Sequence, residues 1–121
     1  MRYVCLIYFD PKKVFNGSTE SNALLAAVGP HDEALKASGQ LVFAQALALP
    51  AEAMTVEVRD GKVSATDGPF IETKEMLGGL TVIEASDLNA AVQLAAGIPF
   101  AQLGSIEVRP VPDYTKPRPK L

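Results

Sequence analysis

The chain has 121 residues, of which 48% are hydrophobic and 21% charged, and its formal net charge is −3. This length suits one domain with one core, and the composition is that of a folded rather than a disordered protein. Because Lys and Arg cluster only in the last few residues, the sequence does not favour a nucleic-acid-binding protein.

The first predicted element is a strand over residues 3–9, which is apolar at successive positions and rich in β-branched and aromatic residues. This pattern is typical of a central strand that is covered on both faces. Cys5 lies in this run, so we interpret it as a small buried hydrophobic residue. The run is too short for a secretion signal or a membrane span, so a cytoplasmic protein without membrane association is expected.

Residues 10–18 contain Pro, Asn, Gly and Ser, which predict a loop. A helix follows over about residues 19–38, because apolar residues and one histidine recur there at helical intervals: Leu24, Val28, His31 and Leu35. Gly29-Pro30 interrupts this helix and predicts either a kink or a second helix that begins with Pro30. Gly39 is placed to end the last turn.

The middle of the chain is predicted to be β-structure. Residues 41–49 form a strand, and residues 55–59 and 62–66 form a hairpin around Asp60-Gly61. Asp-Gly supplies the positive φ angles that a two-residue hairpin turn requires. The single cysteine excludes an internal disulfide in this or any other part of the chain.

The last elements repeat the order of the first ones. We expect a strand over residues 79–84, a helix over residues 87–97 with Ser86 or Asp87 as its N-cap, and a closing strand over residues 105–109. Beyond these, the proline-rich residues 112–121 are expected to be extended or loose.

The resulting order, βαβ, hairpin, βαβ, predicts an α+β fold with a ferredoxin-like antiparallel sheet and an inserted hairpin. Right-handed crossovers place both helices on one face of the sheet. Strand 3–9 is apolar on both faces, so a second copy of the chain is expected to cover the other face. We therefore predict a homodimer built sheet against sheet.

His31 is the only histidine and a candidate for proton transfer near neutral pH. It lies on the apolar stripe of the first long helix, which is more typical of a buried histidine that is hydrogen-bonded to a backbone carbonyl, or of one exposed by a kink at Gly29-Pro30. No second nitrogen or thiolate ligand lies near it in the sequence, so no metal site is predicted.

The loop from Asp67 to Glu75 is a second candidate. Asp67-Gly68-Pro69 is a turn-forming run, and the segment can be read as a simple chain reversal. The polar residues that follow and the pair Gly78-Gly79 favour a functional site, because sites are often built on loops held by a rigid sheet. No glycine-rich phosphate loop opens a helix, so no cofactor is predicted.

Several segments together resemble the DGPF-type proteins of the YCII-related superfamily: residues 1–3, 58–62, 66–75, 77–79 and 106–110. The resemblance covers about residues 1–111 and leaves residues 112–121 as a tail. It implies a ferredoxin-like subunit paired into a dimeric α+β barrel, some of whose relatives are encoded beside sigma factors.

The resemblance also implies a cleft in which a histidine of the first helix faces an aspartate. His31 matches the histidine, and Asp67 is the candidate acid. Gln45 stands where many relatives carry a glycine-rich stretch and is predicted to narrow the floor of the pocket.

Two functions are open at this point. The first is a cofactor-free lyase or isomerase of small molecules, in which His31 moves a proton, Asp67 orients the imidazole, and Thr73 or Lys74 holds an anionic group of the substrate. The second is a non-catalytic ligand-binding or regulatory module, with the same cleft sensing a metabolite or a protein partner such as a sigma factor.

Overall fold

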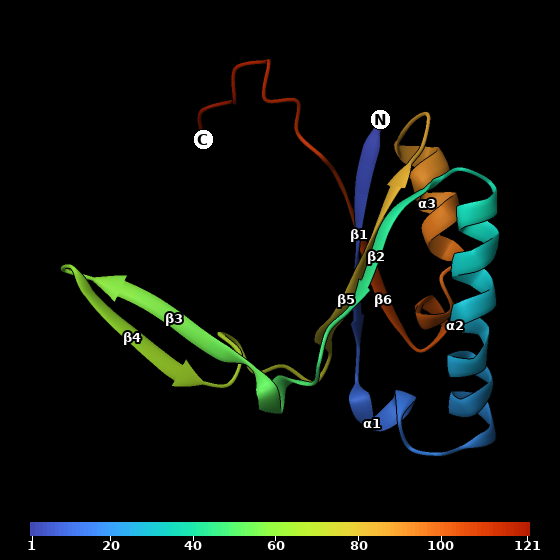
Figure 1. Cartoon of the computed structure of the whole chain (residues 1–121), viewed down its shortest axis with the longest axis horizontal. Coiled ribbons are helices and arrows are strands. Elements are labelled where there is room, and N and C mark those ends of the chain that lie inside the picture. The colour runs from blue at the N-terminus through green and yellow to red at the C-terminus, as the bar shows by residue number, and fades with distance from the viewer.

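The computed structural model describes residues 1–121 and consists of a sheet with helices on one side and a long hairpin on the other (Figure 1). The elements in chain order are β1 (Arg2–Phe9), α1 (Pro11–Val14), α2 (Thr19–Ala37), β2 (Leu41–Ala46), a 3₁₀ turn (Pro50–Glu52), β3 (Met54–Arg59), β4 (Lys62–Asp67), β5 (Met76–Glu84), α3 (Leu88–Ala96), a 3₁₀ helix (Pro99–Gln102) and β6 (Gly104–Pro110). None of the helices has both the length and the apolar character needed to cross a bilayer.

The main sheet has the strand order β2-β5-β1-β6, and every neighbouring pair is antiparallel. This is the ferredoxin-like topology, and α2 and α3 cover the same face of it (Figure 1). The predicted fold class is therefore confirmed. The face of the sheet opposite the helices is called the open face below.

β1 is the central strand, as its sequence predicts. Its odd-numbered residues from Tyr3 to Phe9 are buried beneath the helices, whereas Val4, Leu6 and Tyr8 on the open face are only half-buried. Cys5 is completely buried, and this burial raises the pKa of its thiol to about 11. The cysteine is thus a core residue, as interpreted from the sequence.

β5 contains a β-bulge opposite β1. Ile7 pairs with Gly79 and Tyr8 pairs with Leu77, so Gly78 is an extra residue without a partner. A side chain at Gly78 would overlap the ring of Phe9. Glycine is therefore required here because the aromatic ring lies directly against the backbone.

The hairpin β3–β4 is confirmed, with positive φ at both turn residues, 52° at Asp60 and 73° at Gly61. It forms a separate two-stranded sheet that projects from the lower end of the main sheet, on the side away from the helices (Figure 1). Residues beyond Pro110 also extend away on this side and are mostly exposed, as expected for a loose tail.

Some predicted elements differ from the structure. α2 continues through Pro30, so no second helix begins there. Proline removes one hydrogen bond to the carbonyl of Ala26, but both residues are exposed and water can bind this carbonyl instead. Asp10 caps α1 within the predicted loop by accepting a hydrogen bond from the backbone N–H of Lys12 at 3.0 Å.

Two boundaries also differ. β2 ends at Ala46 rather than at residue 49, and β5 begins at Met76 rather than at residue 79. The extra β5 residues come before the bulge, where the period-two alternation of the strand changes phase. The second predicted helix is correct in position, and Asp87 is its N-cap, accepting a hydrogen bond from the N–H of Ala90 at 2.8 Å.

Candidate functional site

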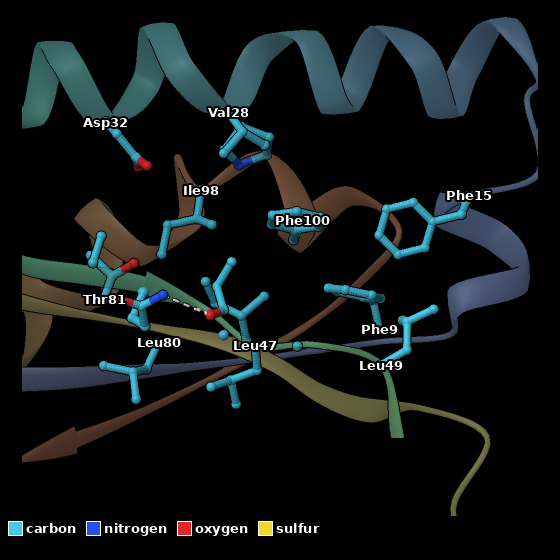
Figure 2. A pocket seen from close by; sticks show the side chains of 17 residues that line it. Phe9, Phe15, Val28, Asp32, Leu47, Leu49, Leu80, Thr81, Ile98 and Phe100 are labelled. Carbon is cyan, nitrogen blue, oxygen red and sulfur yellow. Dashed lines mark hydrogen bonds between the residues drawn. The ribbon is translucent and has the colours of Figure 1, made fainter. Parts of the chain in front are cut away.

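A cavity of about 220 Å³ lies between α2 and the lower half of the main sheet (Figure 2). Its walls come from β1, β2, β5, α2 and the 3₁₀ helix that precedes β6, and most of the lining is apolar: Ile7, Phe9, Phe15, Val28, Asp32, Ala44, Gln45, Ala46, Leu47, Leu49, Gly78, Gly79, Leu80, Thr81, Ile98, Pro99 and Phe100. A space of this size accepts a ligand with one ring, since an engineered apolar cavity of about 150 Å³ is known to hold benzene.

One ionisable side chain reaches into this apolar space. Val28 and Asp32 are four residues apart on α2, so both lie on the helix face that looks toward the sheet. The carboxylate of Asp32 points into the cavity, and its side chain is 39% exposed (Figure 2). A carboxylate held in a mostly apolar cavity is the usual form of an acid–base or ligand-orienting group.

The two ends of the cavity differ in chemistry (Figure 2). At the end near Asp32, the buried residue Thr81 contributes a hydroxyl from β5. At the other end, the rings of Phe9 and Phe100 are stacked with centroids 4.9 Å apart, and Phe15 meets Phe9 edge-on at 5.8 Å. The cavity therefore combines a polar end, which can bind hydroxyl or amino groups, with an aromatic end that can pack against a ring.

His31 lies beside this cavity but does not line it. Its Nδ1 is 3.4 Å from Oδ1 of Asp32, and its side chain is 19% exposed. The ring occupies a neighbouring hollow of about 420 Å³ between α2 and the end of α3, where its Nε2 is 3.7 Å from the position that a Gly97 Cβ would take. The two adjacent residues therefore face different spaces: Asp32 lines the cavity beneath α2, and His31 lines the neighbouring hollow.

The remaining predicted site residues lie in different places. Gln45 does line the cavity, and its amide donates a hydrogen bond to the carbonyl of Ala46 at 2.9 Å. Asp67 and Thr73 line an open hollow at the base of the hairpin, where the Thr73 hydroxyl donates to the carbonyl of Glu75. Lys74 is exposed and forms no ion pair.

The structure consequently does not join His31 to Asp67 by a hydrogen bond or an ion pair; the carboxylate beside His31 is that of Asp32. Asp32 did not stand out in the sequence, because acidic residues on a helix usually face solvent. Its spacing of four residues from Val28, on the predicted inner face of the helix, is the signal that could have found it.

Known proteins resemble this chain in sequence and in fold. Residues 1–115 match the model of the YCII-related domain. A Rhizobium meliloti (strain 1021) protein is 39% identical over 64 residues, which are 51% of this chain and 52% of that protein. The chain thus matches about half the length of this curated relative.

A solved structure extends the comparison. The 5-chloro-2-hydroxyhydroquinone dehydrochlorinase of Burkholderia phenoliruptrix AC1100, in complex with 2,5-dihydroxybenzoquinone, superposes with a TM-score of 0.54 over 93% of this chain and 94% of its own. At 16% identity this likeness shows the fold alone. The match over residues 1–115 shows that the protein belongs to the YCII-related family.

Proposed function

We propose that the protein is a cofactor-free enzyme of the lyase or isomerase type that acts on a small ring compound in the cavity beneath α2. The observation that carries this proposal is the Asp32 carboxylate, which enters a cavity large enough for one ring. Nδ1 of His31 lies 3.4 Å from Oδ1 of this carboxylate, outside the cavity. A dehydrochlorinase with the same fold, solved with a dihydroxybenzoquinone, supports the choice of reaction and substrate class.

The geometry suits a proton transfer. Asp32 faces the ligand and would accept a proton from a carbon or hydroxyl of the ring, while the imidazole of His31 stabilises the carboxylate or takes up the proton. The leaving group departs with its bonding electrons from a saturated ring carbon. The electron pair of a C–H bond on the adjacent carbon, or that of an O–H bond relayed through one C=C bond, then forms the new double bond. Such an elimination neither oxidises nor reduces the substrate, so the two side chains supply what the step requires.

In this proposal Asp32 takes the role that sequence reasoning assigns to Asp67. A contribution of Asp67, Thr73 or Lys74 to ligand binding stays a prediction. The hollow that Asp67 and Thr73 line is open and lies at the base of the hairpin, so these residues are the natural comparison in a binding experiment.

Replacement of Asp32 by asparagine is expected to weaken ligand binding at least tenfold, because the cavity loses its charged group. The measurement is a thermal-shift titration with a panel of neutral single-ring phenols, whose hydroxyls can donate a hydrogen bond to the Asp32 carboxylate. A ligand at ten times its Kd should stabilise the wild type by about 1.4 kcal/mol and raise Tm by about 5 °C. Glu33→Gln removes the same charge one residue later on the exposed side of α2 and should leave this shift unchanged.

Asp67→Asn and His31→Gln complete the set. If Asp67→Asn abolishes the shift and Asp32→Asn retains it, the site lies at the hairpin and the proposal is wrong. Release of chloride from 5-chloro-2-hydroxyhydroquinone by the wild type, with loss in His31→Gln, would establish an enzyme. Binding without turnover of any panel member would instead identify a ligand-binding module.

We also propose that the protein is a homodimer whose open sheet faces pack together. Apolar side chains occupy the middle of this face, including the half-buried Leu6 and Val82 and the 50% exposed Phe43. Light scattering at micromolar concentration is expected to give twice the mass of the chain. The mass of one chain at all accessible concentrations would contradict the dimer.

A further inference from the structure

The β3–β4 ribbon has one apolar and one polar face. The register pairs Val56 with Ala65 and Val58 with Val63, so these side chains share a face with Met54. They are strongly exposed: 59% at Met54, 63% at Val56, 56% at Val58 and 72% at Val63. The other face carries polar side chains and an Arg59–Glu57 ion pair at 3.4 Å.

The ribbon has little support within its own subunit. Its two strands form a sheet of their own, separate from the main sheet. A two-stranded hairpin alone is marginally stable in water, and such ribbons need a packing partner for their apolar face. An amphipathic ribbon that projects into solvent therefore indicates a surface to which its apolar face docks.

The shape of the subunit indicates what the ribbon docks to. It projects from the lower end of the main sheet, on the side of the open face (Figure 1). A body that packs on the open face therefore lies beside the ribbon. One occupant of the size of a second subunit can contact both the sheet and the ribbon.

Charge is compatible with a second copy as this occupant. Arg2 pairs with Glu84 at 2.9 Å on the open face, and Arg109 pairs with Glu107 on the neighbouring edge strand. Within the ribbon, the three acidic residues Glu57, Asp60 and Asp67 exceed Arg59 and Lys62 by one charge. The open face is thus neutral and the ribbon carries one net negative charge, so two copies meet there with little net repulsion.

The area that a stable dimer requires points the same way. Four strands about 4.8 Å apart and about eight residues long give the open face a flat area of roughly 500 Å². In a standard interface each partner buries more, roughly 800 Å² of accessible surface. The ribbon adds roughly 200 Å² of its own face, and by two-fold symmetry it covers a similar area on the other subunit. The total then reaches roughly 900 Å² per partner.

We propose that the β3–β4 ribbon is a dimerisation arm whose apolar face packs against the second copy of the chain, next to the sheet-to-sheet interface. The inference rests on the proposed homodimer and adds a second contact surface to it. The arm also orders the base of the hairpin, where Asp67 lies, through the partner subunit.

The test compares two double variants on neighbouring residues of the ribbon. Val56→Lys with Val63→Lys places two charges on the apolar face, and Ser64→Lys with Thr66→Lys places the same two charges on the polar face. All four side chains are fully or partly solvent-exposed in the subunit, so far-UV circular dichroism should stay unchanged in both variants. The dimer Kd is measured by analytical ultracentrifugation.

The apolar-face variant is expected to raise Kd at least tenfold, and the polar-face variant should stay within threefold of the wild type. Amide exchange in residues 54–67 should also accelerate when the wild type is diluted below its Kd. A dimeric wild type whose Kd is unchanged in the apolar-face variant, or changed equally in both, overturns the arm but not the dimer. A wild type that is monomeric at every concentration overturns the dimer and the arm together.

Discussion

Replacement of Gly104 by alanine is expected to lower the free energy of unfolding by about 3 kcal/mol, the upper end of the usual cost of overpacking. The new Cβ would overlap the carbonyl oxygen of Tyr8 and lie 3.0 Å from the Cβ of Phe9. These are backbone and near-backbone atoms, so no side-chain rotation relieves the overlap. β1 and β6, which pair Phe9 with Gly104, must move apart. Urea unfolding followed by circular dichroism measures the loss.

Gly29→Ala is the matched control for this prediction. It makes the same chemical change within α2, where the added Cβ meets no atom of a distant segment within 4 Å. Alanine favours a helix more than glycine does, but a residue with a Cβ before Pro30 is disfavoured in the helical region, so an effect close to zero is expected. Equal effects of the two substitutions would mean that the close approach of β1 and β6 is not what requires Gly104.

Alkaline pH is expected to destabilise the protein through Cys5. Burial raises the pKa of this thiol from 9.0 to about 11 in the folded state. The folded protein therefore holds the proton more tightly, and stability that is present below pH 9 is lost as the pH rises toward 11. A shift of about two pKa units corresponds to a loss of about 2.7 kcal/mol, since one unit is worth about 1.36 kcal/mol.

Urea unfolding at a series of pH values between 8 and about 11 measures this loss. Cys5→Ala removes the titrating group, so its stability should fall less steeply in this range, although the smaller side chain lowers stability at every pH. Parallel curves for the wild type and Cys5→Ala would contradict an effect of the thiol.

Features set by local chemistry were predictable from the sequence. The Asp60-Gly61 turn needs positive φ angles, and Asp87 is followed by an apolar helical pattern, so both elements lie where expected. Pro30 does not begin a second helix, because its local preference is opposed by the helical residues on both sides. The tertiary setting of α2, which buries Leu24 and Leu35, outweighs one lost hydrogen bond.

The candidate site was less predictable because it depends on contacts between distant segments. His31 was identified by its chemistry, but its partner is the adjacent Asp32, whose importance comes from the cavity formed with β5 and with the 3₁₀ helix Pro99–Gln102. No pattern in the sequence places residues 99–102 opposite α2. The motif around Asp67 identified the family, while the mostly apolar cavity with Asp32 lies elsewhere in the subunit.

The extra residue Gly78 in β5 determines which side chains of this strand face the core. Met76 is buried beside Phe9 and Leu77 is exposed beside Tyr8, whereas Thr81 and Ile83 beyond the bulge are buried at odd-numbered positions. Because Gly78 is one extra residue, the even-numbered Met76 before it lies on the same side of the strand as the odd-numbered Thr81 and Ile83 after it. Deletion of Gly78 would therefore turn Met76 outward and Leu77 inward, an effect that no substitution at Gly78 can produce.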